Sequence, residues 1–265
     1  MKIGFIGCGN MASAIIGGLI NSDKVTGEEI NVYDISKAAM EKLNASYAVH
    51  QQESERAVVL SSDIVILAVK PNVLSSVLDK INTALEESDT LLISIAAGKK
   101  IEFIRNSLSH NNRIIRVMPN INALVGEAIC AYTANKTATE EDKKICETIF
   151  SSVGQVMSLD ENDFPLFGVI AGCGPAFAYM FIDALARSGV KNGMKKEVAL
   201  KIAAQTVLGS AKMIEECDDH PWELIDKVCS PGGTTIEGVT SLQADGFEKA
   251  IQNAVGKSLA KDSKL

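Results

Sequence analysis

One short segment near the end of the chain combines residues that could bind an anion. Ser230-Pro231-Gly232-Gly233-Thr234-Thr235 leads directly into an apolar run that is typical of a helix. Paired glycines cost backbone entropy, which indicates that a group must approach the backbone closely there. The N–H groups at a helix start carry a partial positive charge and favour a carboxylate. The alternative is that Thr234 or Thr235 is only an N-cap, which explains one threonine but not the two glycines.

A second glycine cluster lies close to the N-terminus. Residues 7–12, GCGNMA, have the spacing G-x-G-x-x-A directly after a predicted strand and before a predicted helix. In this context Gly7 allows the tight turn, Gly9 lets a pyrophosphate approach the backbone, and Ala12 allows close helix–strand packing. The pattern predicts a dinucleotide-binding loop, with the phosphates at the helix N-terminus.

The residues after the second predicted strand bear on which dinucleotide binds. Asp34 stands where an acidic side chain bonds a ribose 2′-hydroxyl, which favours NAD. Ser36 and Lys37 follow and could instead hold a 2′-phosphate. A third alternative is that this segment only caps the following helix. The sequence therefore predicts NADPH or NADH without deciding between them.

The cysteines and histidines show no ligand spacing. The six cysteines are scattered without a C-x-x-C pair, and the three histidines lie far apart. This usage indicates reduced thiols in the cytoplasm, with neither a disulfide framework nor a metal site. His220 precedes Pro221, and we expect it to cap a helix.

Composition excludes several classes of protein. The chain has 265 residues, a net charge of −7, 46% hydrophobic and 22% charged residues, as in a soluble globular protein. The negative charge argues against nucleic acid as a partner. No signal peptide and no run of about 18 apolar residues is present, so we expect no membrane segment. Ser263-Lys264-Leu265 matches a peroxisomal address, but we favour a lysine-rich tail that ends so by chance.

The elements that must position these residues follow from periodicity. Short apolar runs at 2–7, 30–34, 63–69, 90–97, 113–119, 128–133 and 156–160 alternate with amphipathic stretches at 11–22, 37–45, 72–85 and 100–108. Strands that alternate with helices predict an α/β fold, a Rossmann-type doubly wound parallel sheet, over residues 1–160.

The remainder, residues 161–265, is predicted to be an all-helical dimerisation domain. Helices are expected at 175–189, 195–217 and 221–229, with one or two more over 234–264. The helix at 195–217 is apolar nearly all round, so it must be buried on all sides. About 105 residues of helix can hardly enclose it alone, which predicts a homodimer through the C-terminal helices.

Six motifs in order resemble those of the pyrroline-5-carboxylate reductase family. They are GFIGCGNM (residues 4–11), AVKP (68–71), SIAAG (94–98), IIRVMPN (114–120), GCGPAF (172–177) and VCSPGGTTIEGV (228–239). The resemblance covers essentially the whole chain, and S-P-G-G-T-T is its most specific part. It implies NAD(P)H-dependent reduction of Δ1-pyrroline-5-carboxylate to L-proline, the last step of proline biosynthesis. It also implies a Rossmann domain, a helical dimerisation domain and, in many members, a pentamer of dimers (a decamer).

The resemblance also implies which residues bind the cofactor. They are Ile6, Gly7, Cys8, Gly9, Asn10 and Met11 at the pyrophosphate, Asp34 and Ser36 near the adenosine ribose, Ala68, Val69, Lys70, Pro71, Ile95, Ala96 and Ala97 along the groove, and Met118, Pro119 and Asn120 near the nicotinamide. The chain departs from the family pattern at Ile121 and Asn122, and at Ala171 and Cys173 in place of two serines.

The implied substrate carries a carboxylate and a cyclic imine. The N–H groups of Gly232, Gly233, Thr234 and Thr235 are expected to hold the carboxylate. The Thr235 hydroxyl is the expected catalytic group near the ring nitrogen, with Ser230 second. A protonated imine is already activated, so positioning carries most of the catalysis. Glu161 is expected to face the substrate.

Two rival functions were weighed against this one. A 3-hydroxyacid dehydrogenase needs a base, typically a lysine in the helix after the domain boundary, and residues 174–189 contain none. A non-catalytic NAD(P)-binding redox sensor would have no use for S-P-G-G-T-T and would bind cofactor without turnover.

Overall fold

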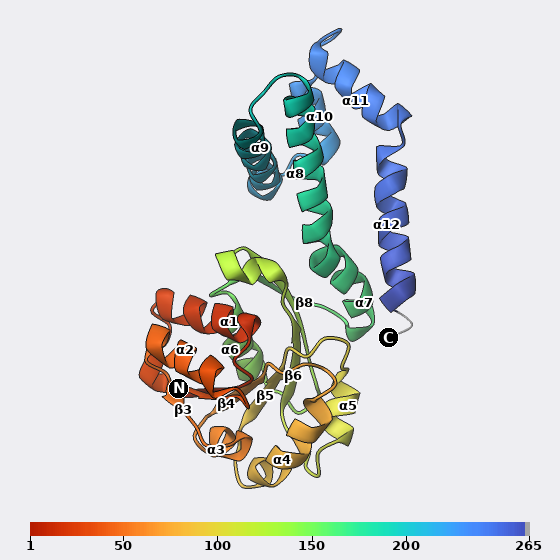
Figure 1. Ribbon diagram of the computed structural model, residues 1–265. Coiled ribbons are helices and arrows are strands. Elements are labelled where there is room, and N and C mark those ends of the chain that lie inside the picture. The colour runs from red at the N-terminus through yellow and green to blue at the C-terminus, as the bar shows by residue number, and fades with distance from the viewer. Residues whose placement is uncertain (263–265) are drawn as a thin grey trace. The chain divides into compact units, whose positions relative to one another are not determined.

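The computed structural model describes residues 1–262 (Figure 1). Two compact units follow one another along the chain, residues 1–172 and the residues from Cys173 onward. The residues from Glu161 to Gly172 therefore belong to the same compact unit as the sheet. The possible address Ser263-Lys264-Leu265 lies outside the described residues.

The first unit is built on one sheet with the strand order β3-β2-β1-β4-β5-β6-β7-β8. The strands are β1 (Ile3–Ile6), β2 (Ile30–Tyr33), β3 (His50–Gln51), β4 (Ile64–Leu67), β5 (Leu91–Ser94), β6 (Ile114–Met118), β7 (Ala128–Ala134) and β8 (Gly154–Ser158). The α/β fold class is confirmed. The sequence analysis did not predict the short strand β3.

The sheet is not wholly parallel, which corrects one expectation. β7 runs antiparallel to β6, whereas β8 is parallel to β7 and the remaining neighbours are parallel. Residues 119–127 join β6 to β7, and a parallel crossover needs about a dozen residues or more. The connection is too short, so the chain turns back on itself.

Helices cover both faces of this sheet (Figure 1). They are α1 (Asn10–Asn21), α2 (Lys37–Tyr47), α3 (Glu55–Leu60), α4 (Leu74–Glu86), α5 (Ile101–Asn106) and α6 (Glu140–Phe150), of which α3 and α6 were not predicted. Alternate residues of β4 enter two separate buried clusters, Ile64 and Ile66 one, Val65 and Leu67 the other. The first cluster includes residues of α1, α2 and α6, and the second residues of α3, α4 and α5. Strands buried on both faces explain the continuous apolar runs.

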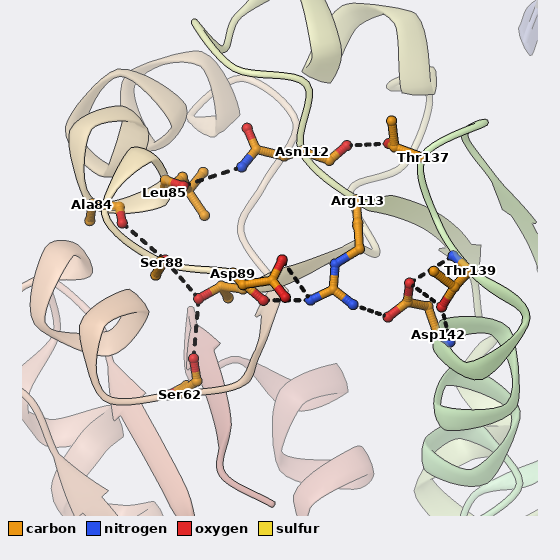
Figure 2. A network of polar contacts seen from close by, with 11 residues as sticks. Ser62, Ala84, Leu85, Ser88, Asp89, Asn112, Arg113, Thr137, Thr139 and Asp142 are labelled. Atoms are coloured by element: carbon orange, nitrogen blue, oxygen red, sulfur yellow. Dashed lines mark hydrogen bonds and ion pairs between the residues drawn. The ribbon is translucent and has the colours of Figure 1, made fainter.

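The amino edge of the sheet is closed by a polar network, shown in Figure 2. Arg113, directly before β6, donates to Asp142 Oδ1 at 2.5 Å and to the carbonyl of Asp89. Asp142 is only 2% exposed, and its other oxygen accepts from the backbone N and the hydroxyl of Thr139, which caps α6. A pocket of about 830 Å³ opens beside this network, at the edge opposite to the predicted cofactor loops. Its two most buried charges already bond each other, so we assign it no ligand.

The second unit is helical, as predicted. Its helices are α8 (Gly174–Lys191), α9 (Lys196–Glu216), α10 (Pro221–Val228), α11 (Thr234–Ala244) and α12 (Phe247–Asp262). Helices α8 and α9 pack together through small residues, and a Cβ added at Gly189 would lie 3.2 Å from the Cβ of Ala199. Within residues 173–262 only Ala186, Ala199 and Ala203 are buried.

Large apolar side chains on α8 and α9 are exposed in the single chain. Met180 is 77% exposed and Leu208 is 58% exposed. The sequence predicted that α9 is buried on all sides, and the chain by itself does not provide that cover. The helical run Glu161–Lys191 is long and apolar enough to cross a bilayer by length and composition alone, a test that helices of soluble proteins also pass, so the expectation of no membrane segment stays a prediction.

Candidate active site

The predicted cofactor loops meet at one edge of the sheet. Each follows the carboxyl end of a strand: residues 7–11 follow β1, Asp34 and Ser36 follow β2, 68–71 follow β4, 95–97 follow β5, and Pro119 and Asn120 follow β6. The strand order reverses between β1 and β4, which places the loops after these strands on either side of a topological switch point. Five loops at the carboxyl edge form the arrangement in which open α/β sheets bind nucleotides.

Gly7 and Gly9 are glycines for different physical reasons. Gly7 has φ +103°, and an added Cβ would lie 2.6 Å from the carbonyl oxygen of Ala68, so both conformation and packing require glycine. Gly9 has an ordinary φ of −75°, and an added Cβ would meet no protein atom within 4 Å. Nothing within the chain requires glycine there, and the open space is where a ligand would approach the backbone.

Helix α1 begins directly behind this open space. Gly9 is its N-cap, no side chain caps it, and its first turn contains no acidic residue. The first N–H groups of a helix have no intrahelical acceptor, and together with the helix dipole they favour an anion. Ala12 is buried against the sheet, as the fingerprint requires. These residues fit the pyrophosphate of a dinucleotide.

Asp34 braces the glycine loop. Its Oδ2 accepts from the backbone N of Cys8 at 2.7 Å, and its Oδ1 accepts from the backbone N of Ser36 at 2.8 Å. Ser36 is the N-cap of α2, so the predicted capping role of this segment is confirmed. Burial, and secondarily the charge of Asp34, raise the pKa of the Cys8 thiol to about 12. The thiol is therefore protonated at neutral pH and adds no charge to the loop.

The Ser230–Gly233 segment is a tight turn. Gly233 N donates to the carbonyl of Ser230 at 3.0 Å. Gly232, which directly follows Pro231 and is the third residue of the turn, has φ +67°. These features define a type II turn, in which the third residue is usually glycine. A Cβ added at Gly233 would lie 2.3 Å from Ser230 Oγ, so the Ser230 hydroxyl would have to rotate away to make room for one.

The turn bears on the donors expected to bind an anion and on the alternative that a threonine is the N-cap. The N–H of Gly233 is used inside the turn, so it is not available to a substrate carboxylate. Thr234 and Thr235 are the first residues of α11, Gly233 is its N-cap, and no side chain caps the helix. Neither threonine is therefore an N-cap. The N–H groups of the first turn of α11 still lack intrahelical acceptors, as at α1.

Comparison with known proteins assigns the chain to a family. The family model described as pyrroline-5-carboxylate reductase dimerisation matches residues 161–265, and the model described as NADP oxidoreductase, coenzyme F420-dependent, matches residues 2–98. The pyrroline-5-carboxylate reductase of Escherichia coli (strain K12) is 43% identical over 265 residues, which cover 100% of this chain and 98% of that protein. The chain belongs to the pyrroline-5-carboxylate reductase family.

Other relatives extend this finding. The pyrroline-5-carboxylate reductase of Methanosarcina acetivorans is 42% identical, covering 100% of this chain and 97% of that protein. The Coxiella burnetii pyrroline-5-carboxylate reductase structure has a TM-score of 0.94 at 31% identity, covering 99% of this chain and 97% of that one. The Plasmodium falciparum pyrroline carboxylate reductase structure with NADP bound has a TM-score of 0.86 at 35% identity, with the same coverages.

Two further side chains that the sequence singled out have hydrogen-bond partners within their own units. Glu161 Oε1 accepts from Arg116 Nη1 at 3.0 Å and from the backbone N of Ile101 at 2.8 Å, all within the first unit. His220 caps α10, as predicted, because its Nδ1 accepts from the backbone N of Trp222 at 3.2 Å.

Sequence reasoning overlooked Arg116, which is only 4% exposed. A charged residue inside the apolar strand Ile-Ile-Arg-Val-Met is a signal that could have revealed it, since buried charges are almost always paired. The family departure Ala171 is buried, and it contributes its main-chain carbonyl, which accepts from Asn120.

Proposed function

We propose that this chain reduces Δ1-pyrroline-5-carboxylate to L-proline with NADPH or NADH, the last step of proline biosynthesis. The observation that carries the proposal is the type II turn at Ser230–Gly233, which leads into a helix start without a side-chain cap and places Thr235 in its first turn. The dinucleotide-type edge of the first unit supplies the other requirement of the reaction. Family membership over the whole chain supports both parts.

The substrate carboxylate would be held at the start of α11. The backbone N–H groups of Gly232, Thr234 and Thr235 are the expected donors that remain once Gly233 is committed to the turn. The positive end of the helix dipole favours the same anion. Gly232 and Gly233 shape this site without side chains of their own. The Thr235 hydroxyl is proposed to bond the ring nitrogen, with Ser230 as a second hydroxyl.

The reduction needs little acid–base chemistry from the chain. The nicotinamide, when bound, supplies the hydride, whose electron pair forms the new C–H bond at the imine carbon. The π electrons of the C=N bond move to the nitrogen, which already carries its proton in the iminium form. No general base is required, so the role of the chain is to hold the carboxylate and orient the ring.

Turnover with defined substrates tests the proposal. Purified protein given Δ1-pyrroline-5-carboxylate and NADPH or NADH is expected to oxidise the cofactor and form an equal amount of L-proline. Cofactor binding without oxidation would contradict the proposal and favour the redox-sensor alternative. Oxidation of a 3-hydroxyacid with NAD or NADP, without activity on the imine, would favour the dehydrogenase alternative.

We further propose a cytoplasmic homodimer in which a second copy covers the exposed apolar faces of α8 and α9. The match of residues 161–265 to a dimerisation model supports it, as do the large apolar side chains that α8 and α9 leave exposed in the single chain. Light scattering is expected to give twice the chain mass of 28.2 kDa, or ten times that mass for a pentamer of dimers. A monomer mass, or partition into neutral lipid vesicles, would contradict this proposal.

A further inference from the structure

One face of β6 contacts the segment that leads toward the C-terminal helices. Side chains alternate along an extended strand, so Arg116, Met118 and Asn120 share a face. These three residues contact successive parts of the segment 161–173. The segment consists of a 3-10 turn (Glu161–Asp163), α7 (Phe164–Phe167) and a π-helical turn (Gly168–Cys173). We call these contacts the β6 seam.

At the first position of the seam, a buried charge meets a carboxylate and an aromatic ring. The Arg116 guanidinium bonds Glu161 at 3.0 Å and lies 4.4 Å from the centre of the Phe164 ring. Glu161 also accepts from the first backbone N–H of α5, the helix after the predicted cofactor loop 95–97. The Glu161 carboxylate therefore links β6, through Arg116, to the start of α5.

The next two positions hold the π-helical turn. A Cβ added at Gly168 would lie 3.2 Å from Met118 Sδ, so the turn packs closely on the end of the strand. Asn120 is 6% exposed, and its Nδ2 donates to the Ala171 carbonyl at 3.0 Å. Its Oδ1 accepts from the backbone N of Ile129, at the start of β7, at 3.3 Å.

The side chain of Asn120 is thus committed to backbone partners on two sides. A buried amide with donor and acceptor both bonded specifies geometry strongly, because loss of either bond leaves a desolvated polar group. A π-helical turn is rare and occurs frequently at functional sites. The Met118–Asn120 loop lies at the end of the strand where the nicotinamide is expected, so the seam ties that loop to the turn before α8.

We propose that Asn120 is a positioning residue: its amide holds the Met118–Asn120 loop against the π-helical turn, so that cofactor binding at the loop is transmitted to that turn. The inference rests on the proposed reduction, in which a loop displaced by about 1 Å is enough to slow hydride transfer. Glu161 acts in the same seam, through Arg116 and the start of α5, rather than by contact with the substrate.

Asn120→Asp tests the critical bond. The aspartate has the same shape and keeps an acceptor for Ile129, but in its ionised form it cannot donate to the Ala171 carbonyl, so the variant is measured across pH up to values at which the carboxyl is ionised. Asn111→Asp is the matched control, because Asn111 is exposed and lies in the loop before β6. If the Asn120→Asp variant does not accumulate as folded protein, Asn120→Ser is tested in its place.

The expected result for Asn120→Asp is a fall in kcat by about 10- to 100-fold, since a small misplacement far from the chemistry can cost about 100-fold. The KM for NADPH should change less than about threefold, and the deuterium isotope effect with 4-deuterated NADPH should increase because hydride transfer becomes slower than product release. A raised KM with unchanged kcat would overturn the proposal and make Asn120 a cofactor ligand. An equal loss of kcat in Asn111→Asp would also overturn the proposal, because the effect would then not be specific to Asn120.

A second measurement does not depend on turnover. In the wild-type chain, NADPH is expected to slow amide hydrogen exchange at residues 168–173 as well as at 118–120, and in Asn120→Asp only the loop should respond. Retained protection of 168–173 in the variant, or its absence in the wild type, would overturn the inference. If the wild type does not reduce the imine, the proposed function fails, and this exchange result still decides the role of Asn120.

Discussion

The two compact units differ most in how much apolar surface each buries by itself. In the first, two clusters cover both faces of the sheet, and every residue of β1, β4 and β5 is buried. In residues 173–262 only three alanines are buried, although α8 and α9 carry many large apolar side chains. Hydrophobic stabilisation scales with apolar area removed from water. The first unit has an apolar core of its own, whereas the second leaves most of its large apolar side chains exposed in the single chain.

The two units nevertheless share one local feature, a helix start with a glycine as N-cap. Helices α1 and α11 both begin behind an N-cap glycine and have no side-chain cap. By contrast, Ser36 and Ser54 cap α2 and α3 with their hydroxyls. Helices α4, α5, α8 and α9 also lack a side-chain cap, but none of these four has a glycine as N-cap. At α1 and α11 the N-cap glycine leaves the first N–H groups open to a ligand, at the predicted cofactor loop and at the proposed substrate turn. The units therefore differ in what stabilises them and agree in how they would bind anions.

The largest expected effect comes from a charge on the exposed apolar face of the second unit. Leu208→Glu should abolish the dimer and the activity, because a carboxylate would be buried without a partner at the proposed interface. Light scattering and turnover measure this. Lys201→Glu, at an exposed charged position of the same helix, is the control. If the Leu208→Glu variant remained an active dimer, the exposed apolar face of α9 would not be the dimer interface.

Loss of the Thr235 hydroxyl should affect catalysis next most strongly. Thr235→Ala is expected to lower kcat by about 100-fold, the scale measured for one donor to a reacting group. Affinity for NADPH, measured by fluorescence titration, should change less than about threefold. Thr240→Ala is the control, because its hydroxyl bonds only carbonyls of its own helix. Equal losses in turnover and cofactor affinity would remove Thr235 from the substrate site.

The amino edge of the sheet should matter for stability and not for turnover. Asp142→Asn replaces the carboxylate that bonds Arg113 and Thr139, and we expect the free energy of unfolding to fall by about 1–3 kcal/mol, because the buried amide must turn its NH₂ group toward one of these two donors. Urea denaturation measures this, with Glu140→Gln as a control at an 84% exposed side chain in the same turn. A lower kcat in the folded variant would show that the two edges of the sheet are not independent.

Asp34→Asn distinguishes a brace from a ribose ligand. The amide keeps one acceptor but turns an NH₂ group toward a backbone N–H, so either Cys8 in the glycine loop or Ser36 at the start of α2 loses its bond. We expect kcat/KM to fall about tenfold with NADH and NADPH alike, since one buried hydrogen bond is worth about 1–3 kcal/mol. A selective loss with NADH would show instead that Asp34 mainly binds the ribose.

The smallest effect concerns thiols. Burial raises the pKa values of Cys8 and Cys130 to about 12, so both thiols stay protonated in the folded first unit well above the pH at which they ionise when unfolded. Stability from these groups is complete below about pH 9, the ordinary range of a thiol, and is lost as the pH rises toward 12. Urea midpoints across this range measure the loss.

Thiol labelling gives the same contrast between the units. At neutral pH the half-buried Cys217 and Cys229 of the second unit should react with a disulfide reagent well before Cys8, Cys130 and Cys146, which are buried. Mass spectrometry of partially labelled protein identifies the sites. Comparable rates at all of these thiols would mean that the first unit opens as readily as the second.

Much of the first unit could be predicted from local pattern. Its long parallel strands are continuous apolar runs, and the glycine fingerprint marks the loop after β1. The short β3 and the helices α3 and α6 were missed because each depends on contacts made elsewhere. The reversal at β7 could have been predicted from the short connection between β6 and β7. β3, for example, has only two residues and exists because it pairs with β2.

The sequence by itself determined the α/β class, the glycine loop and the helical second half, because backbone propensity and apolar periodicity act over a few neighbouring residues. It also marked S-P-G-G-T-T as a special segment. Only the tertiary structure decided that Gly233 N–H is used inside its own turn and that Asp34 braces the loop at Cys8. The seam joining Arg116 and Asn120 to residues 161–171 likewise appears only there. Each of these depends on the distance between groups far apart in sequence or on a backbone angle, and residue types alone do not specify either.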